Sequence, residues 1–160
     1  MQERRPGPVL IDFPANIQSM EGKFNYPSKI EMRSYKPVYE GHPKQIEKAW
    51  ELIENSKKPV IIAGGGVIRS NASDELEKFV EITGIPVAFT LMGLGCMDVG
   101  HPLSLGMLGM HGTRYANYAI VETKVIISIG CRFDDRVTGK TENFAPEAKI
   151  IHIDVDPTAI

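Results

Sequence analysis

The sequence predicts an α/β fold, in which helices cover both faces of an open, mostly parallel β-sheet. Four short runs of β-branched and aliphatic residues, at 59–63, 85–90, 124–129 and 149–153, have the continuous apolar pattern of strands covered on both faces. Segments with a helical spacing of apolar residues alternate with these runs. Because alternating strands and helices form right-handed βαβ units, we expect neighbouring strands to run parallel.

Three helices are expected around these strands. The first begins at Pro43, because proline suits the first helical position, and ends near Lys57 and Lys58. Its apolar residues are Ile46, Ala49, Trp50 and Ile53. The second helix has Asn71 as its N-cap and stops at Gly84.

The third helix is expected at 113–121, with Tyr115, Ala116, Ala119 and Ile120 facing inward. The segment before it, 91–112, is rich in glycine and methionine and shows no obvious regular element. Glycines let a backbone approach a flat ligand closely, and methionines supply adaptable apolar contacts. This segment therefore either lines a ligand site or packs on the sheet as a plain loop.

The N-terminal part of the chain differs from the rest. Residues 1–14 are expected to hold one short apolar strand, which Pro14 closes, and residues 15–41 form an extended polar linker. A single strand needs a sheet to join, so we expect 1–14 to belong to another domain that has been cut off. Residues 42–160 then form the central domain.

Composition excludes several classes of function. The chain has 160 residues, of which 42% are hydrophobic, and a formal net charge of −2, which argues against nucleic acid or an anionic membrane as the main partner. Cys96 and Cys131 lie in no CxxC pair and near no histidine cluster, so we expect neither a disulfide framework nor a metal site. A reducing cytoplasm fits best. We find no apolar run long enough to span a bilayer.

A ligand site is predicted where the strands end. Ligands of open α/β sheets bind beyond the carboxyl ends of the strands. Four such ends are expected to converge, at 64–66, 90–92, 130–137 and 154–156. Within them, arginines and aspartates alternate: Arg132, Asp134, Asp135 and Arg136. Guanidinium groups suit phosphate, and carboxylates suit ribose hydroxyls, although a self-paired, solvated charge cluster is an equal alternative.

The other strand ends give weaker signals. The glycines at 64–66 could receive a phosphate on free amides, but they lack the GxGxxG spacing. Asp154 and Asp156 could bind a ribose or an adenine amine, or Asp156 could simply start a turn before Pro157. His111 could contact a cofactor or satisfy local backbone groups. Because no histidine pairs with a nucleophile or metal ligand, we predict no catalytic residue and a chain that holds a ligand.

Five segments resemble, in order, the central domain of the catalytic large subunit of acetolactate synthase (acetohydroxyacid synthase), in the thiamine-diphosphate enzyme family. They lie at 59–68, 91–95, 105–113, 132–139 and 152–157. The opening residues 5–12 resemble the end of that family's N-terminal, pyrimidine-binding domain. The resemblance implies a Rossmann-like (DHS-like) sheet that lacks its last strand here.

The resemblance also implies a function. The full enzyme uses thiamine diphosphate and Mg²⁺ to condense two pyruvates, or pyruvate and 2-ketobutyrate, to acetolactate or acetohydroxybutyrate with release of CO₂, in branched-chain amino-acid biosynthesis. Its central domain carries an FAD that takes no part in net redox chemistry. A homo-oligomer with a possible regulatory subunit is expected.

The family's site residues are carried over to matching positions of this sequence. They place FAD against Arg5, Gly64, Gly65, Gly66, Thr90, Leu91, Met92, Leu108, Gly109, Met110, His111, Gly130, Cys131, Arg132, Asp134, Arg136, Val137, Asp154 and Val155, to which the strand-end argument adds Asp156. Met110, Asp135 and Arg136 fall near the substrate channel, where Arg136 would help to hold the carboxylate of the second substrate.

The sequence also departs from the family. The catalytic glutamate is expected upstream of Met1 and the metal-diphosphate motif beyond Ile160, so we expect the isolated fragment to be inactive. Ala15 stands where the family usually has a lysine in the substrate channel. Two alternatives remain: the central domain of another thiamine-diphosphate carboligase or decarboxylase, and a free-standing nucleotide-binding or regulatory module.

Overall fold

The computed structural model describes residues 8, 10–28 and 40–156, and the chain divides into two units, 1–39 and 40–160. In the first unit, the described residues form one short helix, α1 (Ala15–Gln18), at the start of the expected linker. The described residues before Pro14 are irregular, and Leu10 is 94% exposed, while the assignment of 1–14 to a strand of another domain stays a prediction.

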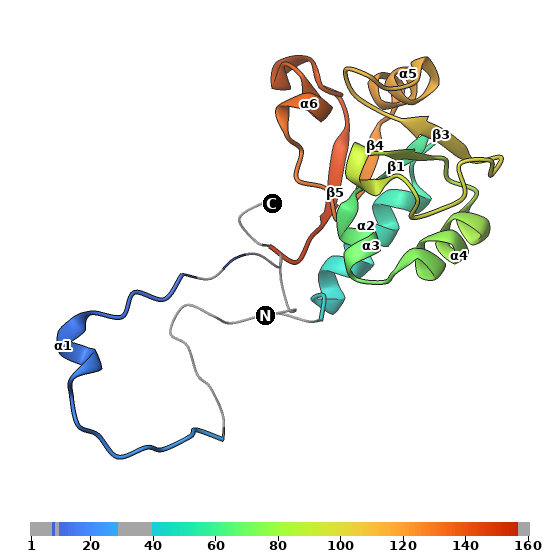
Figure 1. The fold of residues 1–160 in the computed structure, drawn as a ribbon. Coiled ribbons are helices and arrows are strands. Elements are labelled where there is room, and N and C mark those ends of the chain that lie inside the picture. The colour runs from blue at the N-terminus through green and yellow to red at the C-terminus, as the bar shows by residue number, and fades with distance from the viewer. Residues whose placement is uncertain (1–7, 9, 29–39, 157–160) are drawn as a thin grey trace. The chain divides into compact units, whose positions relative to one another are not determined.

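The second unit is built on a five-stranded parallel sheet (Figure 1). Its strands are β1 (Pro59–Ala63), β2 (Val87–Phe89), β3 (Ser104–Met107), β4 (Val125–Ile129) and β5 (Lys149–Ile153). They lie in the order β3-β2-β1-β4-β5, and each neighbouring pair is parallel. This arrangement confirms the predicted open, parallel α/β sheet.

Strand β3 corrects the expectation that residues 91–112 contain no regular element. It lies at the edge of the sheet beside β2, and all four of its residues are half-buried. Because Ser104 and Gly106 interrupt its apolar pattern, and because only one of its edges is paired, its sequence lacks the signal of a central strand.

Helices flank the strands in chain order. They are α2 (Pro43–Glu54), α3 (Gly65–Arg69), α4 (Ser73–Thr83), α5 (Arg114–Glu122) and α6 (Asp135–Thr138), with 3₁₀ turns η1 (Leu91–Gly93) and η2 (Thr141–Asn143). The three expected helices are thus confirmed as α2, α4 and α5. The short α3 and α6 are additional.

Three details of the helices differ from expectation. Helix α2 ends at Glu54, before the two lysines. The N-cap position of α4 is Ala72, because Asn71 is held in a left-handed conformation (φ 55°) that ends the preceding turn. Tyr115 is 75% exposed, since Ala116 and Ile120 occupy the face of α5 that meets the sheet and residue 115 points about 100° away from residue 116. By contrast, the stop at Gly84 is confirmed, with φ 66°.

The core lies on both faces of the sheet, because side chains alternate along each strand. On one face, Ile61 and Phe89 pack with Val67 of α3 and Val80 of α4. On the other face, Val60, Ile62 and Ile126 pack with Ala116 and Ile120 of α5. Helices therefore cover both faces, as predicted (Figure 1).

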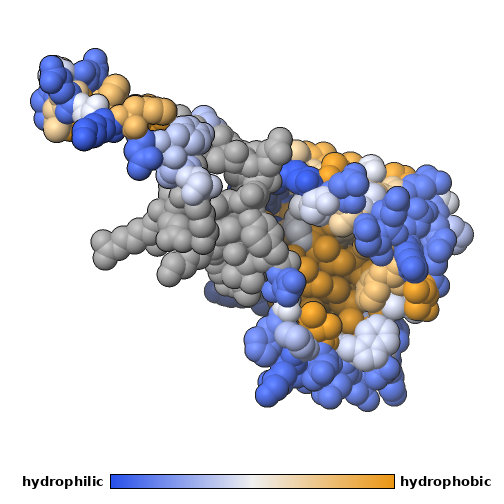
Figure 2. Space-filling view, turned by 90° about the horizontal axis from the view of Figure 1, so that it is seen from below, coloured by the Kyte–Doolittle hydropathy of each residue, from blue (hydrophilic) through white to orange (hydrophobic). Residues whose placement is uncertain are grey.

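Some large hydrophobic side chains stay exposed outside this core. On α2, Ile46 is 60% and Trp50 is 44% exposed. Figure 2 shows that hydrophobic residues gather in one patch on the side seen from below, bordered by hydrophilic residues. No helix among the described residues is long and apolar enough to cross a membrane.

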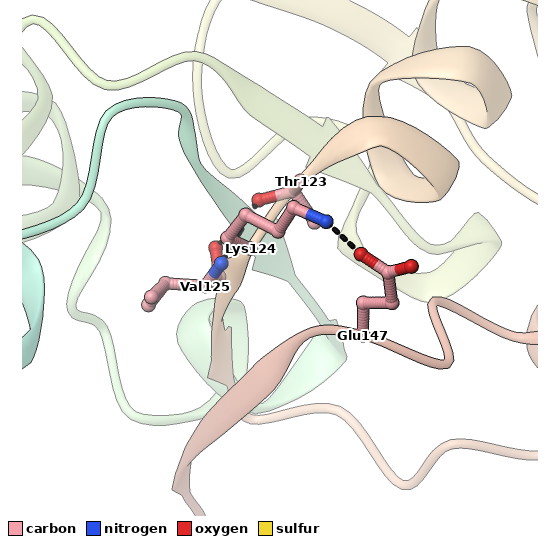
Figure 3. Close-up of polar contacts among 4 residues, drawn as sticks. All are labelled: Thr123, Lys124, Val125 and Glu147. Carbon is pink, nitrogen blue, oxygen red and sulfur yellow. Dashed lines mark hydrogen bonds and ion pairs between the residues drawn. The ribbon is translucent and has the colours of Figure 1, made fainter.

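Polar contacts fix the amino ends of the central strands. The buried Thr123 hydroxyl lies 2.6 Å from the carbonyl oxygen of Lys58, to which it donates, and it accepts from the amide of Val125 at 3.2 Å. Next to it, Lys124 forms an exposed ion pair with Glu147, which precedes β5 (Figure 3). The ammonium group of Lys124 lowers the pKa of the Glu147 carboxyl by hydrogen bonding and by its charge.

Candidate functional site

The carboxyl ends of all five strands meet at one edge of the sheet. Strands β1, β4 and β5 are paired in level register from their first to their last residue. Beyond the strands, backbone bonds continue across the edge, from the amide of Gly64 to the carbonyl oxygen of Ile129 and from that of Gly130 to Ile153, both at 2.8 Å. The structure thus brings together the predicted segments at 64–66, 90–92, 108–111, 130–137 and 154–156. Arg5 lies outside the described residues.

The glycines at 64–66 serve close packing. A Cβ atom on Gly64 would lie 2.2 Å from the carbonyl oxygen of Gly130, and one on Gly65 would lie 2.9 Å from the Cβ of Met92. The amide of Gly66 donates to the carbonyl oxygen of Gly130 at 3.0 Å, and the amide of Gly64 donates to the carbonyl oxygen of Ile129 at 2.8 Å. The expectation of free amides is therefore wrong at Gly64 and Gly66, because these glycines let β1 and β4 converge. Helix α3, which follows them, has only five residues.

The charged loop that follows β4 is open to solvent. Arg132 and Asp134 lie 4.0 Å apart, and their side chains are 64% and 46% exposed. Such an exposed pair contributes little to stability, so the guanidinium group stays accessible to an anion. Asp135 begins α6, and the side chain of Arg136 is exposed.

Aromatic packing holds this loop in a strained conformation. Phe133 has φ 54°, a left-handed conformation that a bulky residue rarely adopts. Its ring packs edge-on against those of Phe144 and His152, with centroid distances of 5.9 and 5.1 Å. The Nε2 atom of His152 donates to the carbonyl oxygen of Cys131 at 2.7 Å. The sequence alone gives neither side chain a role, because these contacts join segments that are separated along the chain.

Cys131 is buried beneath the loop, with 3% of its surface exposed. Burial raises the pKa of its thiol, so the side chain is an uncharged packing group at neutral pH. Thr90 and Leu108 are buried as well. These three predicted site residues could therefore meet a ligand mainly through their backbone atoms.

Other residues at this edge expose apolar surface. Leu91 is 69%, Met92 is 63% and Met110 is 78% exposed. Exposed methionines beside glycines form an adaptable apolar surface of the kind that suits an aromatic ring system.

The residues after β5 form a local turn. The amide of Asp156 donates to the Oδ1 atom of Asp154 at 2.9 Å. This bond agrees with a turn at Asp156 and leaves Asp154 at the carboxyl end of β5. Within the described part of the chain, no cluster of histidine, cysteine and acidic residues could hold a metal ion.

A groove of about 390 Å³ lies between the turn that follows β3, α5 and the segment from α6 to Ala145. Its lining includes Met110, Asp135 and Arg136, so the three predicted channel residues share one concave surface. Asn117, which the sequence analysis missed, also lines it. A larger groove, of about 760 Å³, lies at the opposite edge of the sheet, and its described lining, which includes Trp50, Ile82 and Thr123, contains no predicted site residue.

The parallel sheet and the ligand edge together define a Rossmann-like α/β domain. Its central strand is β1, with β2 and β3 on one side and β4 and β5 on the other, and the glycine-rich turn follows β1. The family model described as "Thiamine pyrophosphate enzyme, central domain" matches residues 46–160, and the chain belongs to this family.

Curated relatives resemble the chain along almost its whole length. A probable acetolactate synthase large subunit of Methanocaldococcus jannaschii is 58% identical over 98% of the chain, and one of Methanococcus aeolicus is 55% identical over 99%. The acetolactate synthase large subunit of Corynebacterium glutamicum is 53% identical over 98%. The matched regions are 27%, 27% and 25% of these three proteins, so the chain spans about a quarter of their length.

Proposed function

We propose that this chain is the FAD-binding central domain of an acetolactate synthase catalytic subunit. The observation that carries the proposal is the identity of 53–58% to acetolactate synthase large subunits over nearly the whole chain. The predicted cofactor segments also lie at the five strand ends, which is where ligands of such sheets bind.

The chemistry of the edge fits a flavin dinucleotide. Arg132 offers an exposed guanidinium group for the diphosphate, and Asp154 lies at the carboxyl end of β5, where a carboxylate suits a ribose. Leu91, Met92 and Met110 offer apolar surface for the ring system. In this role FAD supplies no net redox chemistry, and the residues of the chain bind and orient it.

The reaction of the parent enzyme would take place beside this domain. We propose that thiamine diphosphate and Mg²⁺ are held by other parts of the enzyme, which joins pyruvate to a second 2-keto acid with loss of CO₂. This domain would line the channel with Met110, Asp135 and Arg136, and Arg136 would hold the carboxylate of the second keto acid. A homo-oligomer with a regulatory subunit is part of the proposal. So is a cytoplasmic location, which two free cysteines support.

The complete subunit tests this proposal. Supplied with pyruvate, thiamine diphosphate, Mg²⁺ and FAD, it should form acetolactate. Arg136→Ala should raise the KM for the second keto acid by about tenfold to a hundredfold, because a hydrogen bond to a charged group contributes about 1.5–3 kcal/mol. The matched control is Lys78→Ala, which removes an exposed cation from α4. Decarboxylation of pyruvate without carboligation would favour another thiamine-diphosphate enzyme.

A further inference from the structure

The turn that contains Met110 and His111 is fixed by the side chain of Asn117, which has no role in the proposed function. The amide of Gly112 donates to the carbonyl oxygen of Gly109 at 2.9 Å, which closes a β-turn with Met110 and His111 at its two central positions. Both central residues are exposed at the edge of the sheet where the cofactor is proposed.

Asn117 holds the first residue of this turn by both of its backbone groups. Its Oδ1 atom accepts from the amide of Gly109 at 2.9 Å, and its Nδ2 atom donates to the carbonyl oxygen of Gly109 at 3.0 Å. Asn117 is half-buried on α5, which is itself fixed to the sheet by Ala116 and Ile120. The carboxamide thus ties the turn to a rigid helix.

The turn also packs against the backbone of the charged loop, through Gly109 and Met110. Gly109 has φ 98°, and a Cβ atom on it would lie 2.5 Å from the carbonyl oxygen of Arg136. The amide of Met110 donates to that same oxygen at 3.3 Å. A shift of Gly109 would therefore move Met110 relative to Arg136, and Met110, Asn117 and Arg136 all line the 390 Å³ groove.

We propose that Asn117 is a positioning residue for the ligand site, which acts through Gly109 to fix the Met110–His111 turn against Arg136. The inference rests on the proposed function. A carboxamide can donate and accept at once, and here it uses both groups on the N–H and the C=O of a single residue, Gly109. Asn117 does not itself need to contact FAD or substrate.

Three variants of the complete subunit separate positioning from a merely structural role. Asn117→Ala removes both hydrogen bonds, whereas Asn117→Asp keeps an acceptor for the Gly109 amide and loses the donor. Tyr115→Ala is the matched control on the same helix, since Tyr115 is 75% exposed. The measurements are the dissociation constant for FAD from flavin fluorescence, the KM for the second keto acid, kcat, and amide hydrogen exchange at Gly109.

For Asn117→Ala we expect faster exchange at Gly109 and an increase of about tenfold in the FAD dissociation constant or in the KM, as is typical when a supporting residue is lost. Asn117→Asp should fall between the wild type and Asn117→Ala, and Tyr115→Ala should match the wild type. If Asn117→Ala lowers the melting temperature but leaves FAD affinity and KM unchanged, the positioning role is overturned. If the wild-type protein itself binds no FAD and makes no acetolactate, the proposed function fails instead.

Discussion

Gly64 and Gly130 meet backbone to backbone at the carboxyl ends of β1 and β4, where a Cβ on Gly64 would lie 2.2 Å from the Gly130 carbonyl oxygen. Gly64→Ala should therefore destabilise the domain by about 1–3 kcal/mol or more, since the clashing atoms are main chain and move only with the strands. Urea unfolding measures this change. Gly100→Ala is the control, because a Cβ atom there would lie 3.4 Å from its nearest neighbour, the Oδ1 atom of Asp98, which is an ordinary contact. Equal stability of the two variants would contradict the close approach.

The Thr123 hydroxyl links the amino ends of β1 and β4 through Lys58 and Val125. Thr123→Val keeps the shape of the side chain but removes the donor to the Lys58 carbonyl and the acceptor of the buried Val125 amide, so we expect a loss of about 1–3 kcal/mol in the free energy of unfolding. Thr141→Val, at an exposed position in η2, should change it little. The link would be refuted by a Thr123→Val variant as stable as the wild type.

The buried thiol of Cys131 predicts a pH dependence. Burial raises its folded pKa, so the folded state keeps the proton at pH values where the unfolded chain, with a thiol pKa of about 8.5, has lost it. This contribution to stability is fully present below that pH and is lost as the pH rises through the folded pKa. The free energy of unfolding should therefore fall at alkaline pH, and less steeply in Cys131→Ala.

Cys96 has a raised pKa for the same reason and contributes to the same trend. Both thiols should react with an aromatic disulfide reagent much more slowly in the folded protein than in urea. Rapid reaction of Cys131 in the folded state would show that it is not buried.

Phe133 keeps its left-handed backbone because its ring packs on Phe144 and His152. Phe133→Ala should lose this packing and destabilise the fold by about 2–4 kcal/mol. Alanine still has a Cβ atom, so the backbone strain at φ 54° remains. Phe133→Gly relieves the backbone strain and should be more stable than Phe133→Ala by roughly 1 kcal/mol. Thermal unfolding ranks the three proteins, and the reverse order of the two variants would contradict a strained loop.

The sequence predicts well those elements whose signal is local. Strands β1 and β4 are buried on both faces, so each reads as one apolar run. Gly84 ends α4 because it takes the left-handed conformation that the stop requires. The convergence of the strand ends follows from parallel strands alone.

The remaining features depend on contacts between distant segments. Strand β3 is half-buried and contains Gly106, so its pattern is too weak to predict. In the sequence, Asn117 is an ordinary polar position on a helix. Its bonds to Gly109 form only because the fold brings the turn next to α5.

The most direct test of the central claim is a titration of the protein with FAD, followed by flavin fluorescence and by melting temperature, with ADP and NAD as controls. We predict saturable binding specific to FAD and a rise in melting temperature, because a ligand that binds only the folded state stabilises it. Arg132→Ala should weaken binding by about tenfold while leaving the melting temperature of the free protein nearly unchanged, because its ion pair with Asp134 is exposed. Preference for ADP or NAD, or no binding by the complete subunit, would contradict the account.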